Sequence, residues 1–152
     1  MLRKNHFKNK KIIVGVTGGI AAYKIPQLVR LLKKEGAEVQ VVVTEAAKSF
    51  VTPQTLSVLS ENPVLSDFFK NGQGEWNNHV HLALWADAIV IAPAGANTLA
   101  KMAHGLCDNL LMSVILSSRC PVWVAPAMDL DMWTHASTLS NIKTLMSRGV
   151  NI

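Results

Sequence analysis

The chain has 152 residues, of which 49% are hydrophobic and 16% are charged, with 15 Lys and Arg against 10 Asp and Glu. This length is typical of one domain, and the composition excludes an intrinsically disordered chain. The net charge of +5 comes from the first 11 residues, which hold five cations and no acid. We therefore expect a flexible basic leader over residues 1–11 and a neutral domain over 12–152. A nucleic-acid groove is disfavoured, because phosphate binding requires cations clustered on a folded face.

The sequence also argues against a membrane protein and against a secreted scaffold. No run reaches about 18 uninterrupted apolar residues, and the leader lacks the apolar centre of a signal peptide. Cys107 and Cys120 are too few for a disulfide framework. This favours a reducing, cytoplasmic setting in which both thiols are buried and unreactive.

The first predicted elements form a strand–helix–strand unit over residues 11–43. Residues 11–16 (KIIVGV) are apolar without alternation, which is typical of a strand buried on both faces of a parallel sheet. A second strand is predicted at 39–43. The helix between them ends at Gly36, and its apolar stripe consists of Ile25, Leu28, Val29 and Leu32.

The rest of the chain continues the alternation of strands and helices, with Pro93 ending the third strand. The remaining predictions are strands over 88–92 and 121–125, helices over 53–61, 109–117 and 138–148, and a polar loop over 71–78. This order predicts a single α/β domain with a doubly wound parallel sheet of flavodoxin-like or Rossmann-like type. Another strand would begin near residue 152.

Ligands bind such sheets at the carboxyl ends of the strands, near a switch in strand order. After the first strand, residues 17–22 (TGGIAA) offer glycines and a helix N-terminus, which suit a phosphate, although a tight turn needs glycine as well. The sequence has no P-loop motif and no strict G-x-G-x-x-G. The second strand ends at Thr44, and the acid that would bind a ribose diol in a dinucleotide site follows only at Glu45. A mononucleotide such as FMN is compatible with these absences.

The third and fourth strand ends carry two further motifs. In residues 93–98 (PAGANT), Asn97 and Thr98 either cap a helix or bind a ligand. In residues 126–133 (PAMDLDMW), the two acids either begin a helix or face a ligand, and Met128 suits packing on a flavin ring.

His79 and His81 are the histidines placed to take part in chemistry. Their H-x-H spacing has no companion ligand nearby, so a metal site is disfavoured and none is predicted. A general acid or base is the better interpretation, because histidine titrates near neutral pH. We expect the three strand ends and one histidine to converge on one pocket.

Together these motifs resemble the homo-oligomeric flavin-containing cysteine decarboxylases, from about Lys11 to the last residue. Within that family they are most similar to the members that convert 4'-phosphopantothenoylcysteine to 4'-phosphopantetheine in coenzyme A biosynthesis. The matching segments are residues 15–24 (GVTGGIAAYK), 43–47 (VTEAA), His79 with 82–87 (LALWAD), 93–98 (the family's P-A-S-A-N-T) and 126–133 (its P-x-M-N-x-x-M-W).

The resemblance implies particular roles for these residues. His79, not His81, would be the active-site base, and Asp129 stands where the family has an Asn that binds the substrate carboxylate. Two facing carboxylates repel unless a proton or cation lies between them. FMN would place its phosphate at Gly18, Gly19 and Ile20, and its other contacts would be Thr44, Gly95, Ala96, Asn97, Thr98, Ala127 and Met128.

The family's chemistry is an oxidation by FMN of the substrate thiol to a thioaldehyde, which accepts the electrons released as carbon dioxide leaves. The resemblance implies homotrimers or dodecamers with FMN between subunits. It also implies a cysteine-bearing substrate flap beyond residue 152 and, in bacteria, a fused synthetase domain, so the chain is expected to be part of a longer protein. Three alternatives are a decarboxylase of a peptide C-terminal cysteine, a flavin-binding protein without turnover, and a flavin prenyltransferase. The last would lack the Asn97–Thr98 motif.

Overall fold

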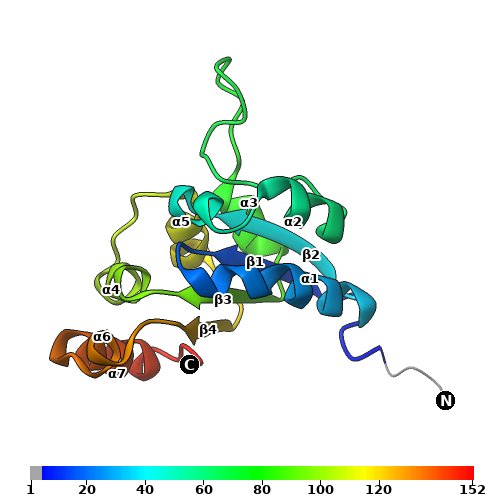
Figure 1. Ribbon diagram of the computed structural model, residues 1–152. Coiled ribbons are helices and arrows are strands. Elements are labelled where there is room, and N and C mark those ends of the chain that lie inside the picture. Colours follow the sequence, from blue (N-terminus) through cyan, green and yellow to red (C-terminus); the bar gives the residue numbers. More distant parts are fainter. Residues whose placement is uncertain (1–4) are drawn as a thin grey trace.

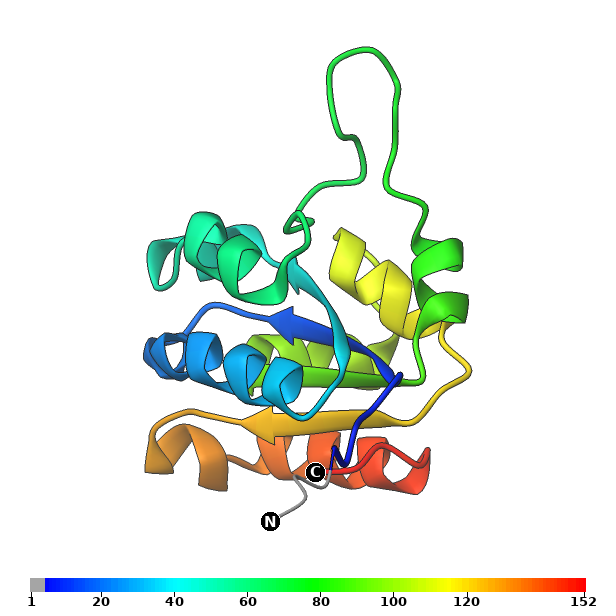
Figure 2. The ribbon, with the colours of Figure 1, turned by 90° about the vertical axis from the view of Figure 1, so that its right-hand side faces the viewer.

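The computed structural model describes residues 5–152 and shows a four-stranded parallel sheet with helices on both faces (Figures 1 and 2). The strands are β1 (Lys11–Val16), β2 (Glu38–Val43), β3 (Ala88–Ala94) and β4 (Val122–Pro126), and their order is β2-β1-β3-β4. The chain adds β2 on one side of β1, and β3 and β4 on the other. The doubly wound, flavodoxin-like prediction is therefore confirmed, with the switch in strand order between β1 and β3.

The helices alternate with the strands along the chain. They are η1 (Ile20–Lys24), α1 (Ile25–Lys34), η2 (Glu45–Ser49), α2 (Pro53–Ser60), α3 (His79–Trp85), α4 (Ala96–His104), α5 (Leu110–Ser117), α6 (Leu130–Thr134) and α7 (Ala136–Ser147), of which η1 and η2 are short 3₁₀-helices. Among residues 5–152, no helix combines the length and the apolar character that crossing a membrane requires.

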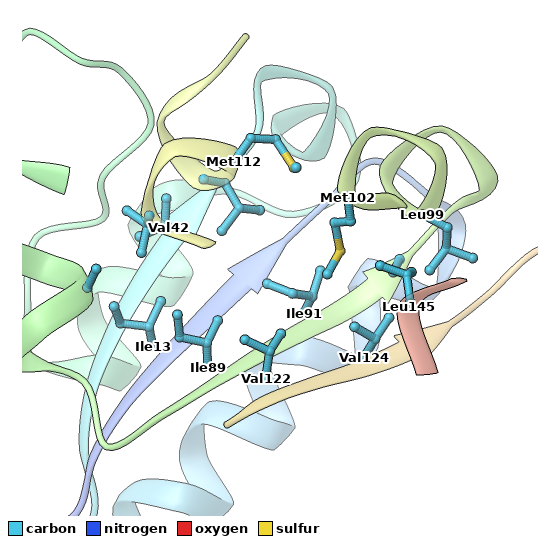
Figure 3. Packing of buried hydrophobic residues seen from close by; sticks show 14 of the residues in the cluster. Ile13, Val42, Ile89, Ile91, Leu99, Met102, Met112, Val122, Val124 and Leu145 are labelled. Atoms are coloured by element: carbon cyan, nitrogen blue, oxygen red, sulfur yellow. The ribbon is translucent and has the colours of Figure 1, made fainter. Parts of the chain in front are cut away.

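Both faces of the sheet are buried, which explains why its strands lack polar alternation. On one face, α1 and α2 cover β1 and β2, with Val14, Val29 and Val41 fully buried. On the other face, α3, α4, α5 and α7 cover a second cluster, which Figure 3 shows around Ile89 and Ile91.

Gly15 lets α5 lie close to the sheet. A Cβ atom at this position would lie 2.6 Å from Cδ1 of Leu111 and 2.8 Å from Cδ1 of Ile91, so any side chain would force these two side chains to shift. This contact brings the N-terminal part of α5 near the end of β1, which matters for the site below.

The predicted strands and most predicted helices are confirmed to within a few residues, with one wrong ending. Pro93 does not end β3, because Ala94 still pairs with Pro126 after a shift in register. Pro93 offers no N–H, but its carbonyl accepts a hydrogen bond from the Thr17 hydroxyl, which ties the ends of β1 and β3 together.

Two peripheral segments complete the fold. Residues 66–78 form an arm that projects from the body (Figures 1 and 2) and is braced by an antiparallel bridge between Phe69 and Trp76. In the leader, residues 1–4 lie outside the described residues. Residues 6–9 hydrogen-bond to Glu35 and Gly36 after α1, so this part is attached to the domain, and flexibility of the leader stays a prediction.

Candidate functional site

Two adjoining cavities lie at the carboxyl edge of the sheet, where the strand order switches. Gly18 after β1 and Gly95 and Asn97 after β3 line both of them, so these residues form the ridge between the cavities. Their volumes are about 340 and 690 Å³, which is the range of small-molecule and cofactor sites. The predicted convergence of the three strand ends is therefore observed.

The loop after β1 is held in place by close packing. A Cβ atom at Gly18 would lie 2.7 Å from Cβ of Ala46, so only glycine allows the loop after β1 to approach the segment after β2 so closely. Within residues 5–152, the amides of Gly18 and Gly19 donate no hydrogen bond. Both N–H groups are therefore free to bind a ligand at this edge.

The smaller cavity, which we call the polar cavity, contains hydroxyl, amide and charged groups. The Thr44 hydroxyl is buried and has no hydrogen-bond partner within the described part of the chain, which is costly unless a ligand supplies one. Asn109 caps α5 by accepting a 2.9 Å hydrogen bond from the Met112 amide. The full lining is Thr17, Gly18, Thr44, Glu45, Ala46, Gly95, Asn97, Thr98, Lys101, Asp108, Asn109, Leu111 and Met112.

The larger cavity, which we call the apolar cavity, is lined by small and apolar residues with one acid. The Asp129 carboxylate caps α6, because its Oδ1 atom accepts a 2.8 Å hydrogen bond from the Met132 amide. The helix-start interpretation of this acid is thus confirmed, while its second oxygen stays available to a ligand. The full lining is Gly18, Gly19, Ile20, Ala21, Gly95, Ala96, Asn97, Ala127, Met128, Asp129 and Met132.

His79 is the predicted site residue that the structure does not bring to these cavities. It begins α3, and Figure 2 shows this green helix, directly after the arm, toward the end of the sheet away from the arrowheads. Its ring stands edge-on to Phe68 and Trp76, with centroid distances of 6.5 and 5.9 Å. Its Nδ1 atom is buried and lacks a hydrogen-bond partner among residues 5–152.

The remaining candidates for chemistry line neither cavity. His81 is exposed on α3. In the described residues no group of three or more His, Cys, Asp or Glu side chains is placed to hold a metal ion. Both cysteines are free, and the prediction that both are buried is wrong for Cys107, which is exposed in the loop after α4, whereas Cys120 is partly buried.

Sequence reasoning missed the helical residues of the polar cavity, in particular Lys101 and Asp108. Lys101 lies four residues after Asn97, so both project from one face of α4. A helix predicted after the 93–98 motif would have placed Lys101 at the cavity.

The comparisons with known proteins decide the family. The sequence profile of the Flavoprotein family matches residues 2–152. The chain belongs to the flavoprotein family. This flavoprotein therefore takes a flavin, and the cavities fit one, because they offer an unsatisfied buried hydroxyl, free backbone amides and an apolar wall.

The sequence is similar to that of a bifunctional enzyme of coenzyme A biosynthesis. It is 46% identical over 143 residues to the coenzyme A biosynthesis bifunctional protein CoaBC of Vibrio vulnificus (strain YJ016), which covers 94% of this chain and 36% of that protein. The chain thus spans about a third of the length of this relative.

Solved structures show the same fold. The FMN-dependent cysteine decarboxylase SpaF superposes with a TM-score of 0.89 at 30% identity, covering 96% of this chain and 84% of that one. A mutant PPC decarboxylase complexed with pantothenoylaminoethenethiol gives 0.81 at 33% identity, with coverages of 95% and 81%.

Proposed function

We propose that this flavoprotein is an FMN-dependent decarboxylase that converts 4'-phosphopantothenoylcysteine to 4'-phosphopantetheine in coenzyme A biosynthesis. The observation that carries the proposal is the pair of adjoining cavities built from the three motif-bearing strand ends. The similarity to CoaBC, 46% identity over 94% of this chain, supports this substrate. A cytoplasmic location belongs to the same proposal.

The chain's own residues would divide the work between the two cavities. Gly18, Gly19, Ile20, Thr44, Gly95, Ala96, Asn97, Thr98, Ala127 and Met128 would hold FMN, whose bound flavin supplies two-electron redox chemistry. Met128 is partly buried and packs against the core, so it is positioned as a fixed wall for an aromatic ring.

Asp129 and His79 would act on the substrate in different ways. Asp129 keeps one carboxylate oxygen free at the apolar cavity, where a proton or a cation between it and the substrate carboxylate would remove their repulsion. His79 would move a proton through its imidazole, whose buried Nδ1 atom has no hydrogen-bond partner among residues 5–152.

The position of His79 supports a homo-oligomeric enzyme, in the form of a trimer or dodecamer. It lines neither cavity of its own chain, so a second copy would have to bring its own His79 to the edge. Several large apolar side chains around the apolar cavity and on the arm are exposed, as expected of surfaces that other copies cover. They are Ile20, Tyr23, Phe69, Trp76, Leu130, Met132 and Trp133.

The test is to purify the chain, identify any bound flavin, and add 4'-phosphopantothenoylcysteine while measuring carbon dioxide and 4'-phosphopantetheine separately. We expect FMN to be bound and carbon dioxide to be released. Bound FMN without carbon dioxide would overturn the decarboxylase proposal for this chain and leave a flavin-binding protein. Protein that cannot be loaded with any flavin would contradict the flavin site itself.

A further inference from the structure

The two cavities differ in the charge that they can accept. The apolar cavity is lined by no Lys, Arg or His, and its one ionisable side chain is the Asp129 carboxylate. A phosphate dianion there would face a negative charge in a partly apolar setting. The polar cavity holds the Lys101 ammonium and the hydroxyls of Thr44 and Thr98, together with the carboxylates of Asp108 and Glu45. Because the polar cavity alone offers a cation and hydroxyl donors, the charged end of a nucleotide is favoured there.

Lys101 is held in a defined position by Asp108. The Nζ atom lies 3.0 Å from Oδ1 and 2.8 Å from Oδ2 of Asp108, and the Lys101 side chain is 21% exposed against 59% for Asp108. The acid thus lies on the solvent side of the ammonium. Because an ammonium has three N–H donors, Asp108 leaves at least one of them for a ligand.

Other donors meet the ammonium in the same cavity. The buried Thr44 hydroxyl has no partner within residues 5–152 and can donate to a phosphate oxygen. The first turn of α4 is preceded by Gly95, which provides no side-chain cap, so the amides of this turn stay available. The remaining acid, Glu45, also lines the cavity, but its carboxylate is bound to Lys48 at 2.6 Å and its side chain is 82% exposed, so its charge is paired and in contact with solvent.

We infer that Lys101, positioned by Asp108, is the residue that donates a charge-assisted hydrogen bond to the phosphate of the bound flavin nucleotide and so selects FMN over riboflavin. This inference rests on the proposed function and adds a residue outside the strand-end motifs. It places the phosphate on the Thr44 side of Gly18 and leaves the apolar cavity to the flavin ring. Gly19 and Ile20 line only the apolar cavity, so this placement departs from the phosphate contacts that the resemblance implies for these two residues.

The experiment measures the binding of FMN and of riboflavin to flavin-free protein by quenching of flavin fluorescence. Lys101→Gln removes the charge, Lys101→Arg keeps it, and Lys143→Gln on α7 is the matched control, because Lys143 lines neither cavity. We expect Lys101→Gln to raise the dissociation constant for FMN roughly 10- to 100-fold, as for a lost charge-assisted hydrogen bond, and to leave that for riboflavin within about twofold. Lys101→Arg should retain most of the FMN affinity.

The outcomes separate this inference from the proposed function. An unchanged ratio of FMN to riboflavin affinity in Lys101→Gln would overturn the inference, as would wild-type protein that binds both flavins equally, while the proposed flavin site would survive. Wild-type protein that binds neither flavin would overturn both. Equal weakening of both flavins, or a shift of the circular dichroism spectrum, would show a structural effect and also count against Lys101 as the phosphate partner.

Discussion

The carboxyl edge of the sheet and the arm with His79 differ in how the chain positions them. At the edge, the Thr17 hydroxyl holds Pro93 and Gly18 packs against Ala46, so the cavities are preformed by one chain. The arm projects from the body, and the ring of His79 is framed by two arm residues, Phe68 and Trp76. In the proposed function, the cofactor cavities are built by one copy of the chain, whereas the reaction centre would also need the His79 of a second copy.

The largest expected effect follows from changing His79. His79→Asn should lower carbon dioxide release about 10²- to 10⁴-fold, the usual contribution of a general acid or base, and leave flavin content unchanged because His79 lines neither cavity. Turnover and bound flavin are measured on the same sample. Loss of flavin in this variant would contradict the separation of the two regions.

Mixed oligomers test whether the flavin cavity and the His79 of one active site come from different copies of the chain. Gly18→Val should abolish flavin binding, because its side chain would collide with Ala46. Co-assembly of this variant with His79→Asn should restore part of the activity, since an intact cavity of one copy then meets the intact histidine of the other. Each variant reassembled alone is the control, and an inactive mixture would show that both residues act within one chain.

A smaller effect, on stability, tests whether the edge is held by its own packing. Gly15→Ala should lower the free energy of unfolding by about 1–3 kcal/mol, because the added Cβ would overlap Leu111 and Ile91 in a packed core. Gly72→Ala on the arm is the matched control, since nothing lies within 4 Å of its added Cβ, and should stay within about 0.5 kcal/mol. Urea unfolding measures both, and equal changes would contradict a tightly packed edge.

Much of the edge could be predicted from the sequence, because its information is local. Buried strands appear as apolar runs, and the glycine and asparagine motifs that follow them mark the ligand-binding ends. The short helix α3 was missed because its seven residues, 79–85, are too few to show a helical period. For α4 the sequence left a helix capped by Asn97 or Thr98 as one alternative; the helix is present, but its cap residue is Gly95, so capping by Asn97 or Thr98 is wrong.

The position of His79 could not be predicted, since it depends on the path of the arm and on neither period nor spacing. The motif identifies His79 as a candidate for the chemistry. It does not indicate which copy of the chain would supply this histidine to a given cavity. Lys101 is different, because its position four residues after Asn97 becomes informative once α4 is known.

Substitutions of Asp129 test whether this residue at the carboxyl edge stabilises the fold, takes part in the reaction, or does both. Asp129→Ala should cost about 0.5–2 kcal/mol of unfolding free energy by removing the cap of α6, whereas Asp129→Asn keeps the accepting oxygen and should change it by a few tenths. Asn also removes a negative charge from the apolar cavity, so the KM for a carboxylate substrate should fall. A KM unchanged in Asp129→Asn would show that the native carboxylate does not repel the substrate.

The smallest effect compares the two cysteines, which lie near opposite ends of the sheet. Burial raises the pKa of the Cys120 thiol, so at pH 8 it holds less of the reactive thiolate, whereas Cys107 is exposed next to Asp108 of the polar cavity. Iodoacetamide should therefore alkylate Cys107 at least about threefold faster than Cys120, as followed by mass spectrometry of the two peptides. Because Asp108 lines the polar cavity, added FMN should slow the reaction of Cys107 and leave that of Cys120 unchanged. Protection of Cys120 instead would place the flavin away from the carboxyl edge. It would then no longer follow that one copy of the chain provides the flavin site and another copy provides the histidine.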